Sequence, residues 1–300
     1  MDEPVGHTPV LASVVRELLA VKRGDIVLDG TVGLGGHARM LGEPLGPDGT
    51  LIGLDVDPAN LRRAGEQLSD LPCRVELRRA NFTEAGEVLE SLAIEGVDVL
   101  FADLGVSSTQ LDDPDRGFSF QRDGPLDMRL DRDQKETAAD LVNRLKEREL
   151  GDLLYYNAQE FASRRIAKRI CEARRTRRIT TTGRLAEVVA SAVGVDPTSR
   201  KSKIHPATRT FLALRMAVND EIPRLLAFLE SAPSMLVPGG RIGVITFHSG
   251  EDKPVKLDFR RRKNEGVYRI ETKKPIVADA EERRVNPRSR SAKLRVAVRA

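Results

Sequence analysis

A glycine-rich turn followed by an acid is the first part of this sequence whose spacing suits chemistry. Gly33-Leu34-Gly35-Gly36 separates a short apolar run from a helical pattern. Glycines at such a turn let the backbone approach a ligand without an intervening Cβ. Asp55 follows about 20 residues later, where an acid at a strand end accepts hydrogen bonds from ribose hydroxyls. This pattern predicts a nucleotide-type cofactor site.

Three further polar side chains, Asp29, Asn81 and Asp103, follow the ends of other predicted strands. Ligands of open α/β sheets lie at the carboxyl ends of the strands. Asp29 suits a positively charged, methionine-like tail, and Phe82 could pack against an adenine. The turn also formally satisfies the nicotinamide fingerprint, so a dinucleotide stays open, but the extra polar groups favour S-adenosylmethionine.

The elements that must position these residues alternate along the chain. A helix is expected through the apolar stripe of residues 11–19, with Thr8 as its cap and Pro9 in its first position. Another helix is expected over 38–45, and a third ends near Leu68. Short runs rich in β-branched residues predict strands at 25–29, 50–54, 74–78 and 97–102. This alternation predicts a parallel sheet covered on both faces.

A long interval separates the fourth strand from the next convincing one, at 241–247 after the turn Pro238-Gly239-Gly240. An ordinary crossover needs only about a dozen residues, and a structureless loop of this length is implausible in a compact domain. The interval contains helical patterns at 138–156, 159–175, 183–193 and 206–217. We therefore expect a sheet domain formed by 1–107 and 216–300, closed by strands at 268–272 and 294–299, with a helical subdomain inserted at 108–215.

Composition indicates a globular protein with a sizeable core, since 40% of residues are hydrophobic and 31% are charged. No apolar run approaches the ~20 residues of a membrane span, and the acidic N-terminus lacks a signal region, so the expected location is the cytoplasm. The net charge of +4 is uneven, because residues 164–178 hold eight cations and one acid. Such a cluster favours phosphate backbones, although a solvated helix face is the alternative.

Several ordered blocks closely resemble the MraW/RsmH family of 16S ribosomal RNA (cytosine-N4)-methyltransferases, over nearly the whole chain. The blocks are His7-Thr8-Pro9-Val10-Leu11, Asp29-Gly30-Thr31-Val32-Gly33-Leu34-Gly35-Gly36-His37, Asp103-Leu104-Gly105-Val106-Ser107-Ser108-Thr109-Gln110, Gly124-Pro125-Leu126-Asp127-Met128-Arg129, His205-Pro206-Ala207-Thr208-Arg209, Phe247-His248-Ser249 and Asn286-Pro287-Arg288-Ser289-Arg290. Two positions depart from the family pattern. Gly250 replaces an apolar residue, and Pro254 falls where a helix should be running, so the start of that helix near Glu251 and the aim of His248 are open.

The resemblance implies a class I methyltransferase (Rossmann-like) fold with a parallel-rich sheet and an inserted all-helical subdomain. It implies that S-adenosylmethionine contacts Gly35, Gly36, His37, Asp55, Phe82, Asp103 and Gln110. The candidate substrate contacts are Asp127, Arg129, His205, Arg209 and His248. The implied partner is small-subunit ribosomal RNA or the assembled small subunit, with a homodimer open and no membrane involved.

For the implied acceptor, a cytosine amine, Asp103 is the candidate catalytic residue. A hydrogen-bond acceptor beside the amine favours the geometry needed for attack, although Asp103 could instead only bind the cofactor or cap its loop. Methylation at carbon-5 would need a cysteine nucleophile. Cys73 precedes the third strand and Cys171 falls in the basic helix, so carbon-5 chemistry is disfavoured. Four scattered histidines and no cysteine cluster argue against a catalytic metal.

Plainer interpretations remain for several of these residues. His205 could simply cap the helix that follows Pro206, and Arg129 could pair with a neighbouring aspartate. The rival functions are a nicotinamide oxidoreductase, a non-catalytic RNA-binding or assembly protein, and a methyltransferase for proteins or small molecules. The basic segment weighs against the last of these.

Overall fold

The computed structural model describes residues 9–194 and 205–300, which form two compact units. We call residues up to Gly105 together with Ile222–Ala300 the sheet unit, and Val106–Glu221 the helical unit. The predicted boundaries, 107/108 and 215/216, fall close to these two crossings. Thr8, the expected cap of the first helix, lies outside the described residues.

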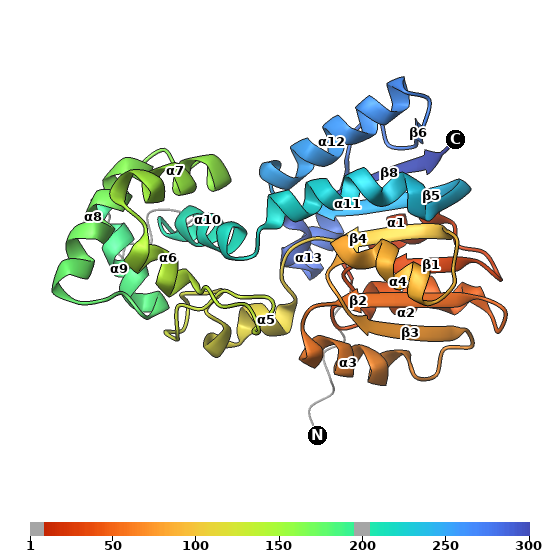
Figure 1. The fold of residues 1–300 in the computed structure, drawn as a ribbon, viewed down its shortest axis with the longest axis horizontal. Coiled ribbons are helices and arrows are strands. Elements are labelled where there is room, and N and C mark those ends of the chain that lie inside the picture. Colours follow the sequence, from red (N-terminus) through yellow and green to blue (C-terminus); the bar gives the residue numbers. More distant parts are fainter. Residues whose placement is uncertain (1–8, 195–204) are drawn as a thin grey trace. The chain divides into compact units, whose positions relative to one another are not determined.

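Eight described strands form one mixed sheet in the sheet unit, in the order β3-β2-β1-β4-β5-β8-β6, with β7 also paired to β8 (Figure 1). The strands are β1 Ile26–Asp29, β2 Thr50–Asp55, β3 Arg74–Arg79, β4 Val97–Asp103, β5 Leu236–Thr246, β6 Tyr268–Ile270, β7 Ile276–Val277 and β8 Lys293–Arg299. The first five are parallel, and β8 runs antiparallel to its neighbours. The order reverses at β1, between β2 and β4, where open α/β sheets bind ligands.

Helices cover both faces of this sheet (Figure 1). They are α1 Ala12–Leu19, α2 Gly36–Gly42, α3 Pro58–Leu68, α4 Ala85–Ser91, α11 Glu221–Met235, α12 Ser249–Asn264 and α13 Ala280–Val285, with short 3₁₀ turns η1 Glu43–Leu45, η2 Phe82–Glu84 and η4 Pro287–Ser291. Alternate strand residues enter different cores: Val99 and Phe101 of β4 pack with α1, α2 and α3, whereas Leu100 and Ala102 pack with α4, α11 and α12. The predicted parallel sheet covered on both faces is confirmed.

The helical unit has its own apolar core. Its helices are α5 Ser108–Asp112, α6 Ala138–Arg144, α7 Glu147–Ala158, α8 Ser163–Thr176, α9 Thr182–Val193 and α10 Thr208–Val218, with the 3₁₀ turn η3 Pro114–Arg116. Side chains such as Leu154, Ile170 and Leu214 are fully buried in one cluster. The single helix predicted over 138–156 is wrong. Leu145 takes an extended conformation, and the backbone N–H of Lys146 donates to Glu149 as a new helix begins.

Two other predicted elements differ in their limits. The first helix begins at Ala12, after Leu11 in the left-handed region, so Pro9 is not its first residue. The strand predicted at 241–247 begins at Leu236. It bulges between its pairings with Val97 and Val99, and the Pro238-Gly239-Gly240 turn lies in this bulge rather than before the strand. Among helices in the described part of the chain, none has the length and apolar character needed to cross a bilayer.

Candidate active site at the carboxyl ends of the central strands

The turn between β1 and α2 depends on glycine at two positions. Gly33 and Gly35 have φ values of 53° and 90°, a region that favours glycine. A Cβ on Gly35 would also lie 3.3 Å from Cα of Ala64 on α3. The turn therefore needs glycine at these two positions, where its backbone carries no Cβ.

Asp55, at the end of β2, ties this turn to the neighbouring strand. Its Oδ2 accepts hydrogen bonds from N–H of Gly33 at 3.0 Å and from Nδ2 of Asn60 at 3.1 Å, while Oδ1 accepts from N–H of Asp57 at 2.8 Å. Burial raises the pKa of Asp55 to about 6 despite these bonds. Because a carboxylate can accept about four hydrogen bonds, Asp55 keeps capacity for a ligand hydroxyl.

Asp29, the last residue of β1, is only 1% exposed. Its Oδ1 accepts the N–H of Thr31 at 3.0 Å, but Oδ2 is buried and has no partner within residues 9–194 and 205–300. Burial raises the pKa of Asp29 to about 7, and the charges of Asp103 and Asp55 also raise it, whereas His37 lowers it. The structure therefore brings the polar ends of β1, β2 and β4 together.

Asp103 and His37 form the other half of this polar group. Nε2 of His37 lies 3.5 Å from Oδ2 of Asp103, and the His37 ring packs 4.9 Å from that of Phe101. Neither ring nitrogen of His37, nor Oδ1 of Asp103, has a hydrogen-bond partner in the described chain, although all three atoms are buried. Buried polar atoms without partners are costly and call for an explanation, and a polar ligand at this point would supply the missing partners.

Sequence reasoning missed Thr31, which joins two of these strands. Its Oγ1 accepts the backbone N–H of Asp103 at 2.6 Å and lies 3.4 Å from Oδ1 of Asp29. The signal was available in principle, because a residue two positions after an aspartate commonly donates its N–H to that carboxylate. Its link to β4, however, depends on the sheet pairing.

Phe82 packs at the end of β3, next to the first glycine of the turn. A Cβ on Gly30 would lie 2.9 Å from Cβ of Phe82, so only glycine fits there. The half-buried Phe82 ring makes an edge-to-face contact with Phe228, with centroids 5.3 Å apart. Asn81 accepts the N–H of Thr83 and so caps the short η2 turn. Phe82 is thus a fixed apolar wall next to the polar group.

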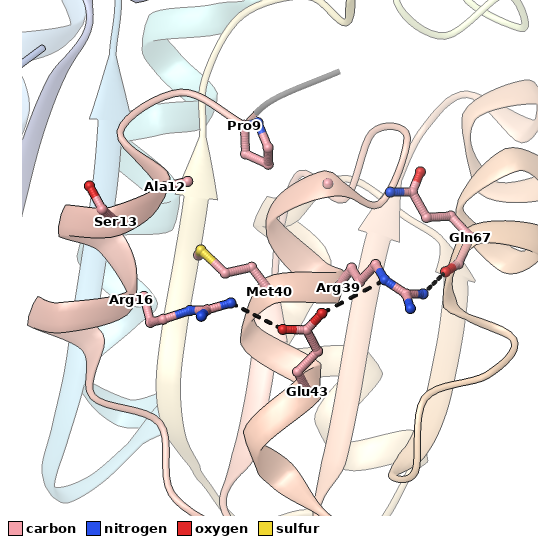
Figure 2. Close-up of a pocket in the computed structure, with 9 residues that line it drawn as sticks. Pro9, Ala12, Ser13, Arg16, Arg39, Met40, Glu43 and Gln67 are labelled. Carbon is pink, nitrogen blue, oxygen red and sulfur yellow. Dashed lines mark hydrogen bonds and ion pairs between the residues drawn. The ribbon is translucent and has the colours of Figure 1, made fainter. Parts of the chain in front are cut away.

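A separate pocket of about 530 Å³ lies beside α1 and α2 (Figure 2). Of the predicted cofactor residues, only Gly36 lines it. Its charged side chains are satisfied by one another: Glu43 pairs with Arg16 at 3.0 Å and with Arg39 at 3.8 Å. Because the unpartnered buried atoms of Asp29, His37 and Asp103 lie together at the strand ends and not in this pocket, we place the candidate active site at the strand ends.

His248 follows β5 and immediately precedes α12. Its backbone N–H and that of Phe247 donate to Oε2 of Glu251, which fixes the start of the helix at Ser249. Its Nε2 lies 3.2 Å from Oε1 of Glu251. Pro254 lies inside α12, beyond its first turn. The helix therefore continues past this proline, which departs from the family pattern.

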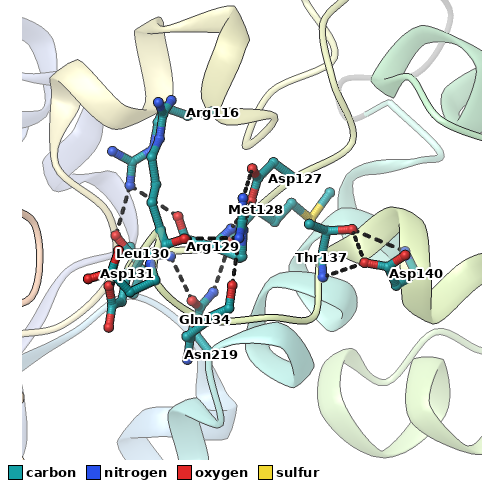
Figure 3. A network of polar contacts seen from close by, with 12 residues as sticks. Arg116, Asp127, Met128, Arg129, Leu130, Asp131, Gln134, Thr137, Asp140 and Asn219 are labelled. Carbon is teal, nitrogen blue, oxygen red and sulfur yellow. Dashed lines mark hydrogen bonds and ion pairs between the residues drawn. The ribbon is translucent and has the colours of Figure 1, made fainter.

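The other predicted substrate residues lie in the helical unit, where Asp127 and Arg129 are held in a polar network (Figure 3). Nε and Nη2 of Arg129 donate to the two oxygens of Asp127 at 2.7 and 2.8 Å. Nη1 donates to the carbonyls of Arg132 and Gln134. Burial acts to raise the pKa of Asp127, but Arg129 holds it below the ordinary value. This pair fixes the loop before α6, as the plainer interpretation of Arg129 expected.

His205, Arg209 and Gln110 also have local partners. Nδ1 of His205 accepts the N–H of Ala207 at 3.1 Å, which matches the capping interpretation, and burial lowers its pKa. Arg209 donates to the carbonyl of Gln159 at 3.3 Å. Oε1 of Gln110 accepts the N–H of Ser107 at the start of α5.

Neither cysteine is placed as a nucleophile. Cys73 is buried directly before β3, at the end of that strand opposite its carboxyl end, and Cys171 is buried on α8. Burial raises the pKa of both thiols, which disfavours the reactive thiolate.

Comparison with known proteins gives this arrangement its context. The chain matches the MraW methylase family over residues 4–300. This chain belongs to that family. Among its relatives, proteins named ribosomal RNA small subunit methyltransferase H are 44% identical in Syntrophobacter fumaroxidans, over 96% of this chain and 95% of the relative, and 45% identical in Acidobacterium capsulatum, over 97% of both. The one in Koribacter versatilis is 45% identical, over 99% of this chain and 95% of the relative.

Membership of the MraW methylase family confirms the resemblance found in the sequence motifs. The chain is an S-adenosylmethionine-dependent methyltransferase, as predicted. The sheet order described above and the family agree on the class I methyltransferase fold. The nicotinamide oxidoreductase and the non-catalytic binding protein are thereby set aside.

Proposed function

We propose that this protein transfers a methyl group from S-adenosylmethionine to the exocyclic N4 amine of a cytidine in small-subunit (16S) ribosomal RNA, in the decoding region that the family resemblance implies. Family membership and the names of the relatives support the ribosomal substrate. One structural observation carries the proposal. Buried polar atoms of Asp29, His37 and Asp103 without partners gather beside a glycine turn at the point where the strand order reverses.

The residues at this point suit S-adenosylmethionine. Asp29 offers a buried carboxylate oxygen for the ammonium group of the methionine part, and Asp55 can accept a ribose hydroxyl. Phe82 offers an apolar surface for the adenine, and the glycine turn brings backbone groups within reach. Gly35, Gly36, His37 and Gln110 complete the proposed cofactor contacts.

Asp103 is the proposed catalytic residue. S-adenosylmethionine, when bound, supplies an electrophilic methyl carbon on a sulfonium sulfur. A cytosine amine is a weak nucleophile because its lone pair is delocalised into the ring. A carboxylate that accepts a hydrogen bond from this amine favours the pyramidal geometry needed for attack, and alignment of nitrogen and carbon is then the main task of the protein. The unpartnered Oδ1 of Asp103 is available for this bond.

The helical unit is the proposed RNA-binding part. On α8, Ile166 and Ile170 are fully buried, whereas Arg165, Lys168 and Arg169 are exposed. A stripe of cations on one helix face attracts phosphates irrespective of sequence. The proposed substrate contacts are Asp127, Arg129, His205, Arg209 and His248. The partner is naked ribosomal RNA or the assembled small subunit, and a homodimer remains compatible with both.

Methyl mapping tests the proposal directly. Small subunits that lack the modification are incubated with labelled S-adenosylmethionine and the protein, and the labelled nucleotide is then located by mass spectrometry. We expect one labelled cytidine, with the methyl group on its exocyclic nitrogen. A methyl group on a ring carbon, or no transfer to RNA, would contradict the proposal.

The Asp103→Asn variant distinguishes the two roles considered for this residue. If Asp103 orients the amine, the maximal rate should fall by about 100-fold or more while the dissociation constant for S-adenosylmethionine stays nearly unchanged. A purely cofactor-binding role would instead weaken S-adenosylmethionine binding. Asp98→Asn is a matched control on the same strand, because Asp98 accepts the N–H of Ile26 and an asparagine oxygen can do the same.

A further inference from the structure

The exposed aromatic side chains of this protein are gathered in one place. The chain has three tyrosines and nine phenylalanines, and in the described residues the exposed ones are Tyr155, Tyr156 and Phe161, which are 45%, 75% and 77% exposed. All three lie at the end of α7 and in the short connection to α8. We call these three residues the aromatic cluster. Exposure of several aromatic rings to water is unfavourable, and such a group commonly marks an interaction site.

The three rings contact one another and stay partly exposed. The Tyr155 ring makes edge-to-face contacts with Tyr156, at 5.4 Å between centroids, and with Phe161, at 6.4 Å. The guanidinium of Arg209, on α10, lies 5.8 Å from the centroid of the Phe161 ring. Arg209 is in turn held by the carbonyl of Gln159. These contacts fix the orientation of the cluster, and Tyr156 and Phe161 remain about three-quarters exposed.

Cations lie next to these rings on the first turns of α8. Arg164 ties the two helices together, because it donates to Asp152 and to the carbonyl of Arg148 on α7. Arg165 and Lys168 follow on the exposed side of α8 and make no ion pair with any residue in 9–194 or 205–300. The surface thus combines rings that can stack with cations whose charge is not neutralised.

We propose that the aromatic cluster stacks unpaired nucleobases of the RNA substrate while Arg165 and Lys168 contact the adjacent phosphates. The inference rests on the proposed function, in which the substrate is RNA. Exposed rings beside a positively charged track are the features that bind single-stranded nucleic acid without sequence preference. Aromatic rings and arginine are also common in protein–protein interfaces, but the eight cations and one acid of residues 164–178 attract phosphates and repel a second copy of the same segment. This charge favours RNA over a second copy of this chain.

Binding of short RNA oligonucleotides tests this inference. The dissociation constants of a single-stranded RNA, a duplex of equal length and an abasic strand with the same phosphates are measured by fluorescence anisotropy. For the single strand, we expect the Tyr156→Ala/Phe161→Ala variant to bind about 5- to 150-fold more weakly, the equivalent of about 1–3 kcal/mol for one stacked base. For the abasic strand, the variant and the parent protein should differ by less than about two-fold.

Two further variants complete the design. Leu226→Ala removes an exposed apolar side chain from α11 and should leave single-strand binding unchanged. The chain has no tryptophan, so Phe161→Trp adds one indole ring that can be excited separately from the tyrosines and that keeps a stacking surface. It should retain affinity, and its fluorescence should be quenched by the base-containing strand but not by the abasic one.

The outcomes separate this inference from the proposed function. If the parent protein methylates small subunits but the double alanine variant binds the single strand as the parent does, the stacking site is wrong and the proposed function stands. If the parent transfers no methyl group to RNA, the proposed function fails independently of the cluster. A variant that binds RNA normally yet changes its sedimentation coefficient would overturn the inference in favour of contact between two copies.

Discussion

At the scale of single residues, the candidate site contains buried carboxyl groups whose hydrogen bonds do not fully offset the cost of removing their charge from water. Asp29 has a pKa raised to about 7 and Asp55 a pKa raised to about 6, in both cases mainly by burial. A cation nearby stabilises a carboxylate that is kept out of water. The ammonium group of a bound cofactor therefore offsets the desolvation cost of the ionised carboxylate. Binding and acid–base behaviour are therefore coupled here.

Asp29→Asn tests this coupling through stability. Because the pKa of Asp29 is raised in the folded protein, the folded protein binds more protons than the unfolded chain between about pH 4 and pH 7. Stability therefore falls as pH rises through this window and stays low above it. Above pH 7, we expect the variant without cofactor to have a higher free energy of unfolding than the parent. Near pH 4 the two should agree, as measured by denaturant unfolding. Equal free energies of unfolding at pH 8 would show that the ionised Asp29 does not destabilise the folded protein.

The same variant should lose affinity for the cofactor. An ionised Asp29 favours the ammonium group, so parental affinity for S-adenosylmethionine should decline as pH falls through about 7 and Asp29 becomes protonated. At pH 8 we expect Asp29→Asn to bind at least about 10-fold more weakly, as for the loss of a charged hydrogen bond. Isothermal titration calorimetry at several pH values measures both effects. An unchanged affinity would remove Asp29 from the cofactor site.

Thr31 makes a separate prediction, because it supports Asp103 without being a candidate ligand contact. Thr31→Val keeps the shape of the side chain but leaves the N–H of Asp103 without its acceptor. We expect a loss of about 1–3 kcal/mol in the free energy of unfolding. Thr31→Ser retains the hydroxyl oxygen and should recover most of this loss. If valine and serine behaved alike, the hydroxyl would not be the cause.

At the scale of elements, the sequence predicts strands better than it predicts where helices stop. The strands β1, β2 and β4 are short runs of mostly buried apolar residues, whereas β3 alternates polar and apolar residues and is not buried; these patterns locate all four to within a residue or two. The break at Leu145 was not predicted because 138–156 keeps a helical pattern across it. The bulge at 237–240 depends on pairing with β4, which no local pattern shows. The carboxylates were predicted because they follow strand ends, whereas the unpartnered state of Asp29 and His37 depends on tertiary burial.

Gly35→Ala tests the turn between β1 and α2. The substitution combines a left-handed φ of 90° with a Cβ only 3.3 Å from Cα of Ala64. Gly24→Ala is a matched control, because Gly24 has a φ of 83° and open space around it. Both should lose about 1 kcal/mol or more from backbone strain, and Gly35→Ala should lose more and also bind S-adenosylmethionine more weakly. Equal losses in thermal unfolding would mean that close packing at Gly35 is unimportant.

At the scale of the whole molecule, the two units differ in the charged residues that they carry. The sheet unit concentrates buried acids, while the helical unit carries a row of exposed cations over its own apolar core. A protein with a net charge of only +4 can attract RNA if its cations are gathered on one surface rather than spread evenly. The salt dependence of RNA binding reports how many of those cations reach phosphates.

The paired variant Arg165→Gln/Lys168→Gln tests this division. Each cation that contacts a phosphate of a single strand contributes about 0.7 to the slope of log affinity against log salt. Removing both should reduce the slope by about 1.4 and weaken binding at low salt, while the affinity for S-adenosylmethionine stays at the parental value. Arg184→Gln, on α9, is the control, since Arg184 is already paired with Glu187 at 3.2 Å. If the paired variant kept the parental slope, α8 would be a solvated helix face, and the charge that attracts RNA would have to lie elsewhere on the molecule.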